Sequence, residues 1–241
     1  MGGFPGTKQL FLSLLKQFFP PACPLCSQTF PSDYTDVFCV ACLTGFNPLP
    51  VAHCPHCALP FVGESNSSHL CGRCIKQAPN YAQVYAVGLY DQTLRRAIHQ
   101  FKFNRKVGLD RSLGILLERA VPSDLNIDLV VPVPIHRQRL QQRSYNQALL
   151  LAREFARTRQ LSVAEDVLLK VYATEPQQGL SAKQRVKNLH RVFDLRGPVS
   201  GRAILLVDDV MTTGATVDAC SRVLLAGGAK VVYVAVIGRA A

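Results

Sequence analysis

Past residue 79 the chain alternates short apolar runs with longer amphipathic stretches. Residues 82–90 have the composition of a strand, and residues 92–103 repeat their apolar positions at the spacing of a helix. Later apolar runs rich in β-branched residues predict buried strands, and the stretches between them predict helices. Strands that alternate with helices indicate an α/β domain built on a parallel sheet. The later strands are predicted at 127–133, 162–171, 203–207 and 230–237, and the clearest helices at 145–159 and at 213–226, ended by Gly227 and Gly228.

Residues 20–78 have a different pattern, with frequent Pro, Gly, Ser and Cys and no sustained period. The apolar run at residues 10–19 is interrupted by Lys16, and it is shorter than the ~18 to 20 residues that span a bilayer. It predicts a short amphipathic helix that packs on its own protein. We therefore expect a cytoplasmic protein without stable membrane insertion. We place a domain boundary near residue 79, with a cysteine-rich module at 1–78 and the α/β domain at 79–241.

Eight of the nine cysteines form four Cys-x-x-Cys pairs. Two thiolates at this spacing on a tight turn can bind one tetrahedral ion, and a second pair after 12 or 13 intervening residues completes four sulfur ligands. The module is therefore predicted to hold two structural zinc ribbons, because metal binding supplies folding energy to a segment with few apolar residues. Iron–sulfur ligation and an interleaved pairing of the four motifs stay open at this point. The predicted ligands are Cys23, Cys26, Cys39, Cys42, Cys54, Cys57, Cys71 and Cys74.

The remaining candidates near these motifs are given smaller roles. His53, His56 and His69 lie close to the cysteines in sequence, but eight thiolates already suffice for two ions, so we interpret them as bystanders. Cys220 stands alone in a predicted helix and is interpreted as a small buried apolar residue.

The net charge of +11 is carried almost entirely by the α/β domain. Residues 1–78 contain four Lys or Arg and three Asp or Glu, which leaves +10 for residues 79–241. A basic domain attracts nucleic acid or phosphorylated small molecules, and charge alone does not choose between them. The near-neutral module is a poor candidate for binding DNA by itself, so a structural role is favoured over a binding surface.

The segment 202–216 carries the most specific motif of the chain. A buried strand leads into two adjacent carboxylates, Asp208 and Asp209, and then into a short loop that opens a helix. Ligands of parallel α/β sheets bind beyond the carboxyl ends of strands, and amides at a helix N-terminus bind anions. Gly214 lets the backbone close on a phosphate, and the carboxylates can accept hydrogen bonds from hydroxyl groups or metal-bound water. The phosphate-binding loop is predicted at Thr212, Thr213, Gly214, Ala215 and Thr216.

Three arginines follow the strand predicted at 127–133. Arg137, Arg139 and Arg143 lie just past its end, where guanidinium groups would suit a doubly charged pyrophosphate group. A solvated basic loop is the alternative. Neither a P-loop nor a dinucleotide-binding glycine motif is present, so nucleoside triphosphate and NAD binding are not expected.

Ile204 to Thr216 resembles the signature that type I phosphoribosyltransferases use to bind phosphoribosyl pyrophosphate (PRPP). That resemblance implies a type I phosphoribosyltransferase fold, in which Asp208 and Asp209 hold the ribose hydroxyls and the loop 212–216 holds the 5′-phosphate. The wider chain resembles the ComF/GntX family. Its motifs are matched by Val-Pro-Val-Pro at 131–134, by Ser144 to Gln147, by Tyr90, Asp91, Lys102 and Lys106, and by Thr174, Gln177, Leu180, Ser181, Arg185, Asn188 and Phe193. Lys170 stands where the family often has Arg.

The resemblance implies binding of PRPP with Mg²⁺ and a role in DNA uptake (natural transformation) or DNA utilisation. Catalytic candidates for phosphoribosyl transfer are Asp208, Asp209, Arg137, Arg143, Lys183 and Arg185, the last two with Lys187 as candidates for a loop that closes over PRPP. Two alternatives stay open: a factor that binds single-stranded nucleic acid together with the DNA-uptake machinery, and a PRPP sensor without turnover. The first would weaken steeply with salt, whereas PRPP binding would depend on Mg²⁺ and the two carboxylates.

Overall fold

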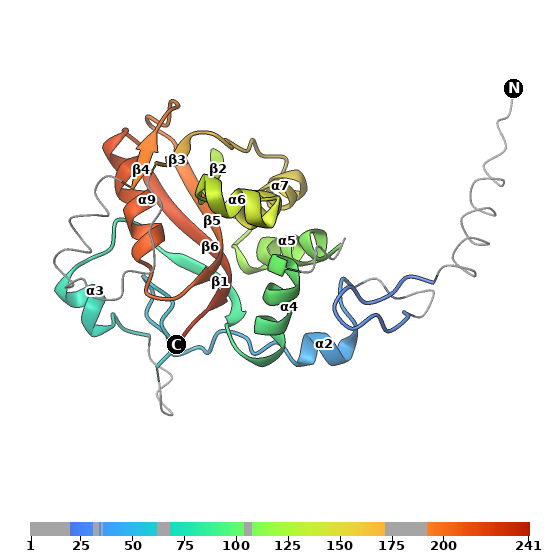
Figure 1. Cartoon of the computed structure of the whole chain (residues 1–241). Coiled ribbons are helices and arrows are strands. Elements are labelled where there is room, and N and C mark those ends of the chain that lie inside the picture. The colour runs from blue at the N-terminus through green and yellow to red at the C-terminus, as the bar shows by residue number, and fades with distance from the viewer. Residues whose placement is uncertain (1–19, 31–33, 35, 62–67, 104–107, 172–191) are drawn as a thin grey trace, which may run out of the picture.

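The computed structural model describes residues 20–30, 34, 36–61, 68–103, 108–171 and 192–241. The order of elements alternates strands with helices, as the sequence predicts (Figure 1). The helices are α2 (Val40–Thr44), α3 (Gly72–Lys76), α4 (Gln92–Phe103), α5 (Leu109–Ala120), α6 (Arg137–Arg143), α7 (Gln147–Arg159) and α9 (Ala215–Ala226). The strands are β1 (Val84–Leu89), β2 (Leu129–Pro132), β3 (Leu168–Lys170), β4 (Phe193–Leu195), β5 (Ala203–Met211) and β6 (Val231–Arg239).

A four-stranded parallel sheet in the order β1-β6-β5-β2 forms the centre of the molecule. Side chains of β5 point alternately to the two faces, because successive residues of a strand face opposite ways. Ile204 and Leu206 pack in the same core as α9, whereas Leu205 and Val207 pack with α4, α5 and α7. The sheet is therefore covered by helices on both faces, which makes the domain α/β as expected (Figure 1).

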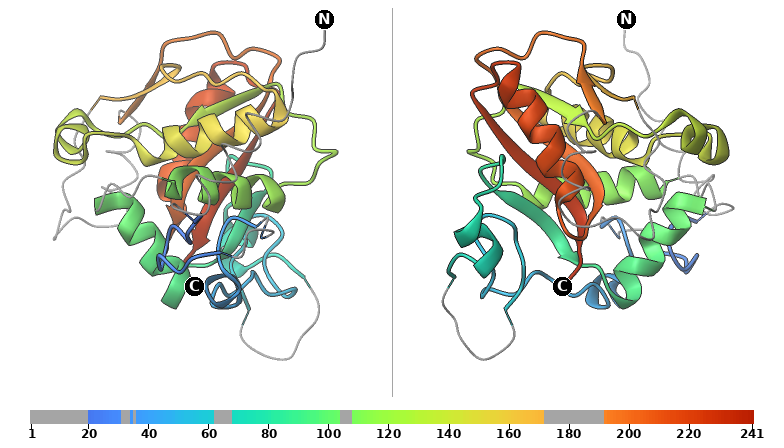
Figure 2. Two further views of the ribbon diagram at one scale, coloured as in Figure 1. Left: turned by 90° about the vertical axis from the view of Figure 1, so that its right-hand side faces the viewer. Right: turned by 60° about the vertical axis from the view of Figure 1, so that its left-hand side comes forward.

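The two zinc ribbons of the cysteine-rich module lie on opposite sides of this sheet. The first ribbon, residues 20–46, shares the core of α4 and α5, and the second ribbon, residues 52–77, shares the core of α9. Figures 1 and 2 show α2 next to α4, and α3 on the side of α9. The chain from Asn47 to the start of the second ribbon covers the edge of β1, where Leu89 N–H donates to Asn47 O at 2.8 Å and Val84 N–H donates to His56 O at 3.0 Å.

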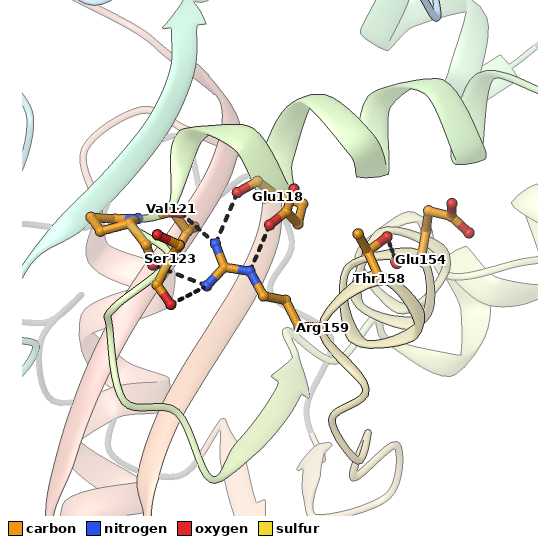
Figure 3. A network of polar contacts seen from close by, with 7 residues as sticks. Glu118, Val121, Ser123, Glu154, Thr158 and Arg159 are labelled. Atoms are coloured by element: carbon orange, nitrogen blue, oxygen red, sulfur yellow. Dashed lines mark hydrogen bonds and ion pairs between the residues drawn. The ribbon is translucent and has the colours of Figure 1, made fainter.

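Helices α5 and α7 are joined by a network around Arg159 (Figure 3). Its Nε donates to Glu118 at 2.6 Å, and its terminal nitrogens donate to the carbonyls of Val121 and Ser123 at 2.6 and 3.3 Å. Along the two helices, a Cβ added to Gly114 would lie 2.5 Å from Glu154 Cβ. The absence of a side chain at Gly114 is therefore what allows this close approach.

The prediction that residues 162–171 form one strand of the parallel sheet is wrong. Only Leu168–Lys170 form a strand, β3, which pairs antiparallel with β4 in a separate two-stranded sheet. Val163 makes a single parallel bridge to Val130. The exposed Glu165 and Asp166 form a turn that interrupts the run, since charged side chains cannot continue into the core.

Other boundaries differ by a few residues. β5 continues to Met211, so Asp208 and Asp209 lie within the strand and not just after it. Helices α7 and α9 begin at Gln147 and Ala215, two residues later than predicted, after their caps Asn146 and Gly214. Helix α5 was not predicted. The helix expected at residues 10–19 lies outside the described residues. Within the described part of the chain, no helix is long and apolar enough to cross a membrane.

Candidate anion-binding site and metal centres

The two carboxylates sit side by side in the central strand and point to opposite faces. Asp209, on the side of α4, forms an ion pair with Lys102, whose Nζ lies 3.0 Å from its Oδ2. Both side chains of this pair are largely buried. Asp208 accepts a hydrogen bond from the backbone N–H of Asp209 at 2.8 Å. The alternation of the strand therefore gives the two acids different neighbours.

The electrostatics of Asp208 depend on these neighbours. Burial and then the charge of Asp209 raise its pKa to about 7, against the lowering effects of the Asp209 amide and of Lys102 and Lys170. Burial and then the charge of Arg139 lower the pKa of Lys170. Asp208 is therefore only partly ionised near neutral pH, and a bound cation would stabilise its ionised form.

A cavity of about 190 Å³ opens beside the carboxylates, at the carboxyl ends of β2 and β5. This is the edge at which ligands of parallel sheets bind. Arg143 lines it from α6, and its guanidinium also lies over the Phe103 ring, 5.2 Å from the ring centroid. Four cationic side chains against two acids make the cavity suited to an anion held together with a divalent cation. Its charged and hydroxyl lining consists of Lys102, Arg139, Arg143, Lys170, Asp208, Asp209 and Thr216.

The loop 212–216 has the geometry of an anion-binding turn. Gly214 is the N-cap of α9 and has a φ of 79°, in the left-handed region that glycine adopts without strain. The Ala215 N–H lies 3.4 Å from Thr213 Oγ1. A helix of this length directs its free N-terminal amides and its dipole toward the loop.

The structure brings some of the predicted residues together and leaves others apart. Asp208, Asp209, Arg143 and Thr216 line the 190 Å³ cavity. Arg137 is exposed on α6 and does not line it. Thr213, Gly214 and Ala215 line a second cavity of about 570 Å³ between the loop and the second ribbon, and Thr212 is exposed next to them. Lys183, Arg185 and Lys187 lie outside the described residues.

The lining of the cavity also includes Lys102, Arg139, Gln147 and Lys170, which were absent from the predicted catalytic set. Gln147 begins α7, is 2% exposed, and its Nε2 has no hydrogen-bond partner among the described residues. A buried amide donor is costly without a partner, so its place in the cavity wall points to a ligand. The Asn-Gln pair in the family motif was the available signal for Gln147.

The cysteines form two groups that follow the simpler, consecutive pairing. Within each group all four sulfurs lie within 4.8 Å of one another. Tetrahedral Zn²⁺ with Zn–S bonds of roughly 2.3 Å needs sulfurs at about this separation, so both groups fit the ion. No histidine belongs to either group in the described part of the chain, and Cys220 is fully buried in α9, as expected. The groups are Cys23, Cys26, Cys39 and Cys42, and Cys54, Cys57, Cys71 and Cys74.

The thiols of each group are unequal. Burial raises the pKa of Cys23, but hydrogen bonds from the Cys39, Cys26 and Leu25 amides and the Cys26 thiol outweigh it and bring the pKa to about 7. Cys54 in the other group has the same balance and also a pKa of about 7. Burial and neighbouring thiols raise the pKa of Cys42 and Cys74. Four thiolates in so small a space require a cation, and structural Zn²⁺ supplies that charge.

Comparison with known proteins adds sequence and structural relatives. Residues 14–75 match the family described as double zinc ribbon domain. DNA utilization protein YhgH of Escherichia coli K12 is 36% identical over 188 residues, covering 75% of this chain and 81% of that protein. Competence protein F of Haemophilus influenzae is 33% identical over 211 residues, covering 84% and 90%.

Solved structures similar to this chain include two proteins whose names refer to phosphoribosyl chemistry. Glutamine PRPP amidotransferase from B. subtilis aligns with a TM-score of 0.42 at 20% identity, covering 57% of this chain and 30% of that one. Adenine phosphoribosyltransferase from Saccharomyces cerevisiae aligns with a TM-score of 0.34 at 18% identity, covering 54% and 69%.

Proposed function

This chain belongs to the ComF family of competence and DNA utilization proteins, and on that premise we propose that it binds PRPP with Mg²⁺ in the uptake or use of DNA. The observation that carries this proposal is the 190 Å³ cavity, in which Asp208 and Asp209 face a cluster of Lys and Arg side chains. The loop that follows them opens α9 through Gly214. Such a pairing of an acidic strand end with an anion-binding loop suits a phosphorylated sugar diphosphate.

In this proposal the 190 Å³ cavity and the adjacent loop 212–216, from which Thr216 reaches into the cavity wall, each bind one part of PRPP. Asp208 and Asp209 hold the ribose hydroxyls, and their hard carboxylate oxygens also suit Mg²⁺. The loop 212–216 holds the 5′-phosphate through its amides and hydroxyls. Arg143 and Arg139 hold the pyrophosphate from α6. Arg137, exposed on α6, is the third arginine of this pyrophosphate cluster. Lys183 and Arg185, outside the described residues, complete the predicted set as candidates for a loop that closes over the bound molecule.

Phosphoribosyl transfer is the reaction that this arrangement favours. The bond between C1 of the ribose and the pyrophosphate oxygen breaks, its electron pair leaves with pyrophosphate, and a nucleophile of the acceptor forms the new bond at C1. Positive charge develops on the sugar and negative charge on the leaving group. Carboxylates on one side and guanidinium groups on the other stabilise both, so catalysis rests on positioning and electrostatics.

Calorimetric titration of the zinc-loaded protein with Mg-PRPP tests the proposal. We expect Asp208→Ala/Asp209→Ala to weaken binding by at least about 100-fold, since two hydrogen-bonding charged groups are lost. The matched control is Asp124→Ala/Asp166→Ala, which makes the same change in charge at two exposed acids that do not line the cavity. Absence of binding by the folded wild-type protein would reject the proposal. Binding of PRPP without release of pyrophosphate in the presence of any acceptor tested would leave the protein as a PRPP sensor without turnover.

Single-stranded DNA is the second candidate ligand, because α6 exposes Arg137 and Arg139 next to the cavity in a domain of net charge +10. Binding through phosphate contacts would weaken steeply as salt rises and would survive Asp208→Ala/Asp209→Ala. Titration of a labelled oligonucleotide at several salt concentrations separates the two ligands, with Arg137→Ala/Arg139→Ala as the variant that should lose DNA first.

A further inference from the structure

The second ribbon and the phosphate loop are joined by a buried arginine. Arg239 ends β6, directly opposite Met211 in the sheet register, and is 2% exposed. Its Nε donates to the carbonyl of Cys57, a predicted zinc ligand, at 2.8 Å. Its Nη1 donates to the carbonyls of Thr212 at 2.8 Å and Met211 at 3.3 Å, and also to Ala240 O. One guanidinium therefore spans from the metal-binding turn to the loop.

No salt bridge joins Arg239 to a carboxylate within the described part of the chain; the acceptors identified for it are backbone carbonyls. A buried guanidinium without a counter-charge is costly, and an apolar side chain would fill the same space more cheaply. What the arginine adds is its fork of donors, which holds several carbonyls in fixed directions at once. The geometry therefore indicates a positioning role.

A second arginine extends this contact by one residue along the loop. Arg73 of α3, in the second ribbon, donates to the carbonyl of Thr213. A Cβ on Gly214 would lie 2.5 Å from Met211 Cε, 3.3 Å from Tyr81 Oη and 3.6 Å from Arg73 Nη2. The ribbon side of the loop is thus in close contact with Tyr81 and Arg73.

The segment after the ribbon also reaches the first turn of α9. Asp218 Oδ1 accepts from the backbone N–H of Asn80 at 2.7 Å and from its Nδ2 at 3.0 Å. Ribbon, connecting segment and helix N-terminus are therefore held together by polar contacts on one side of the loop.

These contacts determine the direction of the loop amides. In a trans peptide the carbonyl of one residue and the N–H of the next point in opposite directions, and none of the described peptide bonds is cis. The carbonyls of Thr212 and Thr213 point to Arg239 and Arg73, and the carbonyl of Met211 accepts from the Ala240 N–H at 2.9 Å and from Arg239 at 3.3 Å. The following amides, those of Thr212, Thr213 and Gly214, therefore point away from the ribbon, which is the orientation that an anion on the other side of the loop requires.

We infer that the second zinc ribbon contributes to the phosphate site. Arg73 of the ribbon, and Arg239 bound to the ribbon, orient the loop amides toward the bound anion. The inference rests on the proposed function. It makes Arg239 a positioning residue that touches no ligand itself. It also implies that ligand and metal support each other, because the same carbonyl contacts connect the loop to the turn of Cys57.

Arg239→Met tests the inference, with Arg159→Met as the matched control. Arg159 is also a poorly exposed arginine that donates to backbone carbonyls, but it joins α5 to α7 on the other face of the sheet (Figure 3). We expect Arg239→Met to weaken Mg-PRPP binding by at least about 10-fold, while Arg159→Met changes it by less than about 2-fold even if both melt earlier. Arg239→Lys should fall between, since it keeps the charge and fewer donors.

Zinc release gives a second readout, measured first on the wild-type protein. With a chromogenic chelator in excess, saturating Mg-PRPP should slow the release of one of the two zinc ions from the wild-type protein and leave the other unchanged. In Arg239→Met the ligand should slow neither. If Arg239→Met does not fold, Arg73→Ala, an exposed residue, is expected to weaken binding in the same direction.

The outcomes separate this inference from the proposed function. Wild-type protein that does not bind Mg-PRPP rejects both. Wild-type protein that binds, together with Arg239→Met and Arg73→Ala of equal affinity or zinc release that ignores the ligand, rejects the coupling alone and leaves the proposed function standing.

Discussion

The two faces of the central sheet carry similar parts and use them differently. Each face has one cysteine group and, because successive side chains of β5 alternate, one of the two adjacent aspartates. On the α4 face, the first ribbon is joined to α5 by an exposed ion pair between Asp36 and Arg119 at 2.9 Å. On the α9 face, the second ribbon contacts the loop 212–216 through a fully buried arginine, Arg239. Identical metal chemistry therefore has different consequences depending on what the ribbon packs against.

The largest effect is expected from removing one zinc ligand on each face. Cys57→Ser and Cys42→Ser should each lower the zinc content from two ions to about one and reduce stability strongly, because structural zinc supplies folding free energy. Only Cys57→Ser is expected to abolish Mg-PRPP binding. Metal quantification and calorimetric titration measure the two quantities. Equal loss of Mg-PRPP binding in both variants would contradict the claim that only the second ribbon acts on the site.

Two glycines offer the next comparison. Gly214→Ala forces an unfavourable left-handed conformation, at about 1–2 kcal/mol, and pushes on Met211, so PRPP affinity should drop by about 10-fold or more. Gly114→Ala inserts a methyl group between α5 and α7 and should lower the free energy of unfolding by about 1–3 kcal/mol without changing affinity. Denaturant unfolding and titration of both variants measure the two quantities. An affinity loss in Gly114→Ala would contradict the separation of the faces.

The pH dependence of stability should reveal Asp208. Its folded-state pKa is raised to about 7, so the folded protein holds this proton more tightly than the unfolded chain. The resulting stability is fully present below the unfolded pKa of about 3.9 and is lost as the pH rises through about 7. Asp208→Asn should remove this loss, on the order of 1 kcal/mol or more. Urea unfolding at about pH 5 and about pH 8 tests it, and parallel pH profiles for the two proteins would contradict it.

The smallest effect is expected at the first ribbon's ion pair. Arg119 and Asp36 are both well exposed, so Arg119→Met should cost no more than about 1 kcal/mol and leave zinc content and PRPP affinity unchanged. Thermal unfolding and titration measure this. A clear loss of affinity would show that the first ribbon also acts on the site.

The strand, loop and helix between Ala203 and Ala226 could be predicted from residues that are close together in the sequence. The β-branched run predicts the strand, Gly214 permits the left-handed cap, and Gly227 ends the helix as expected. The cysteine spacing likewise predicts two metal sites, because ligand pairs on tight turns are a property of a few neighbouring residues. The strand at 162–171 failed because an apolar run contained a charged turn whose effect depends on burial.

Contacts between elements that are distant in the sequence could not be predicted from such local patterns. The family motif includes Lys102 but does not show that it faces Asp209, since their ion pair depends on how α4 packs against the sheet. Lys170 also lines this cavity. It lies in β3, which pairs with β4 and does not join the parallel sheet as the sequence predicts.

The sequence by itself determined the two Cys₄ groups, the α/β class and the acidic strand end followed by a glycine-containing loop, because each is encoded by residues close together in the chain. Only the tertiary structure decided which ribbon meets which face, and that Arg239 near the C-terminus holds both Cys57 and the phosphate loop. The physical reason is that a guanidinium becomes a bridge only when its acceptors, 182 and 27 residues away in the chain, are brought together in a buried place.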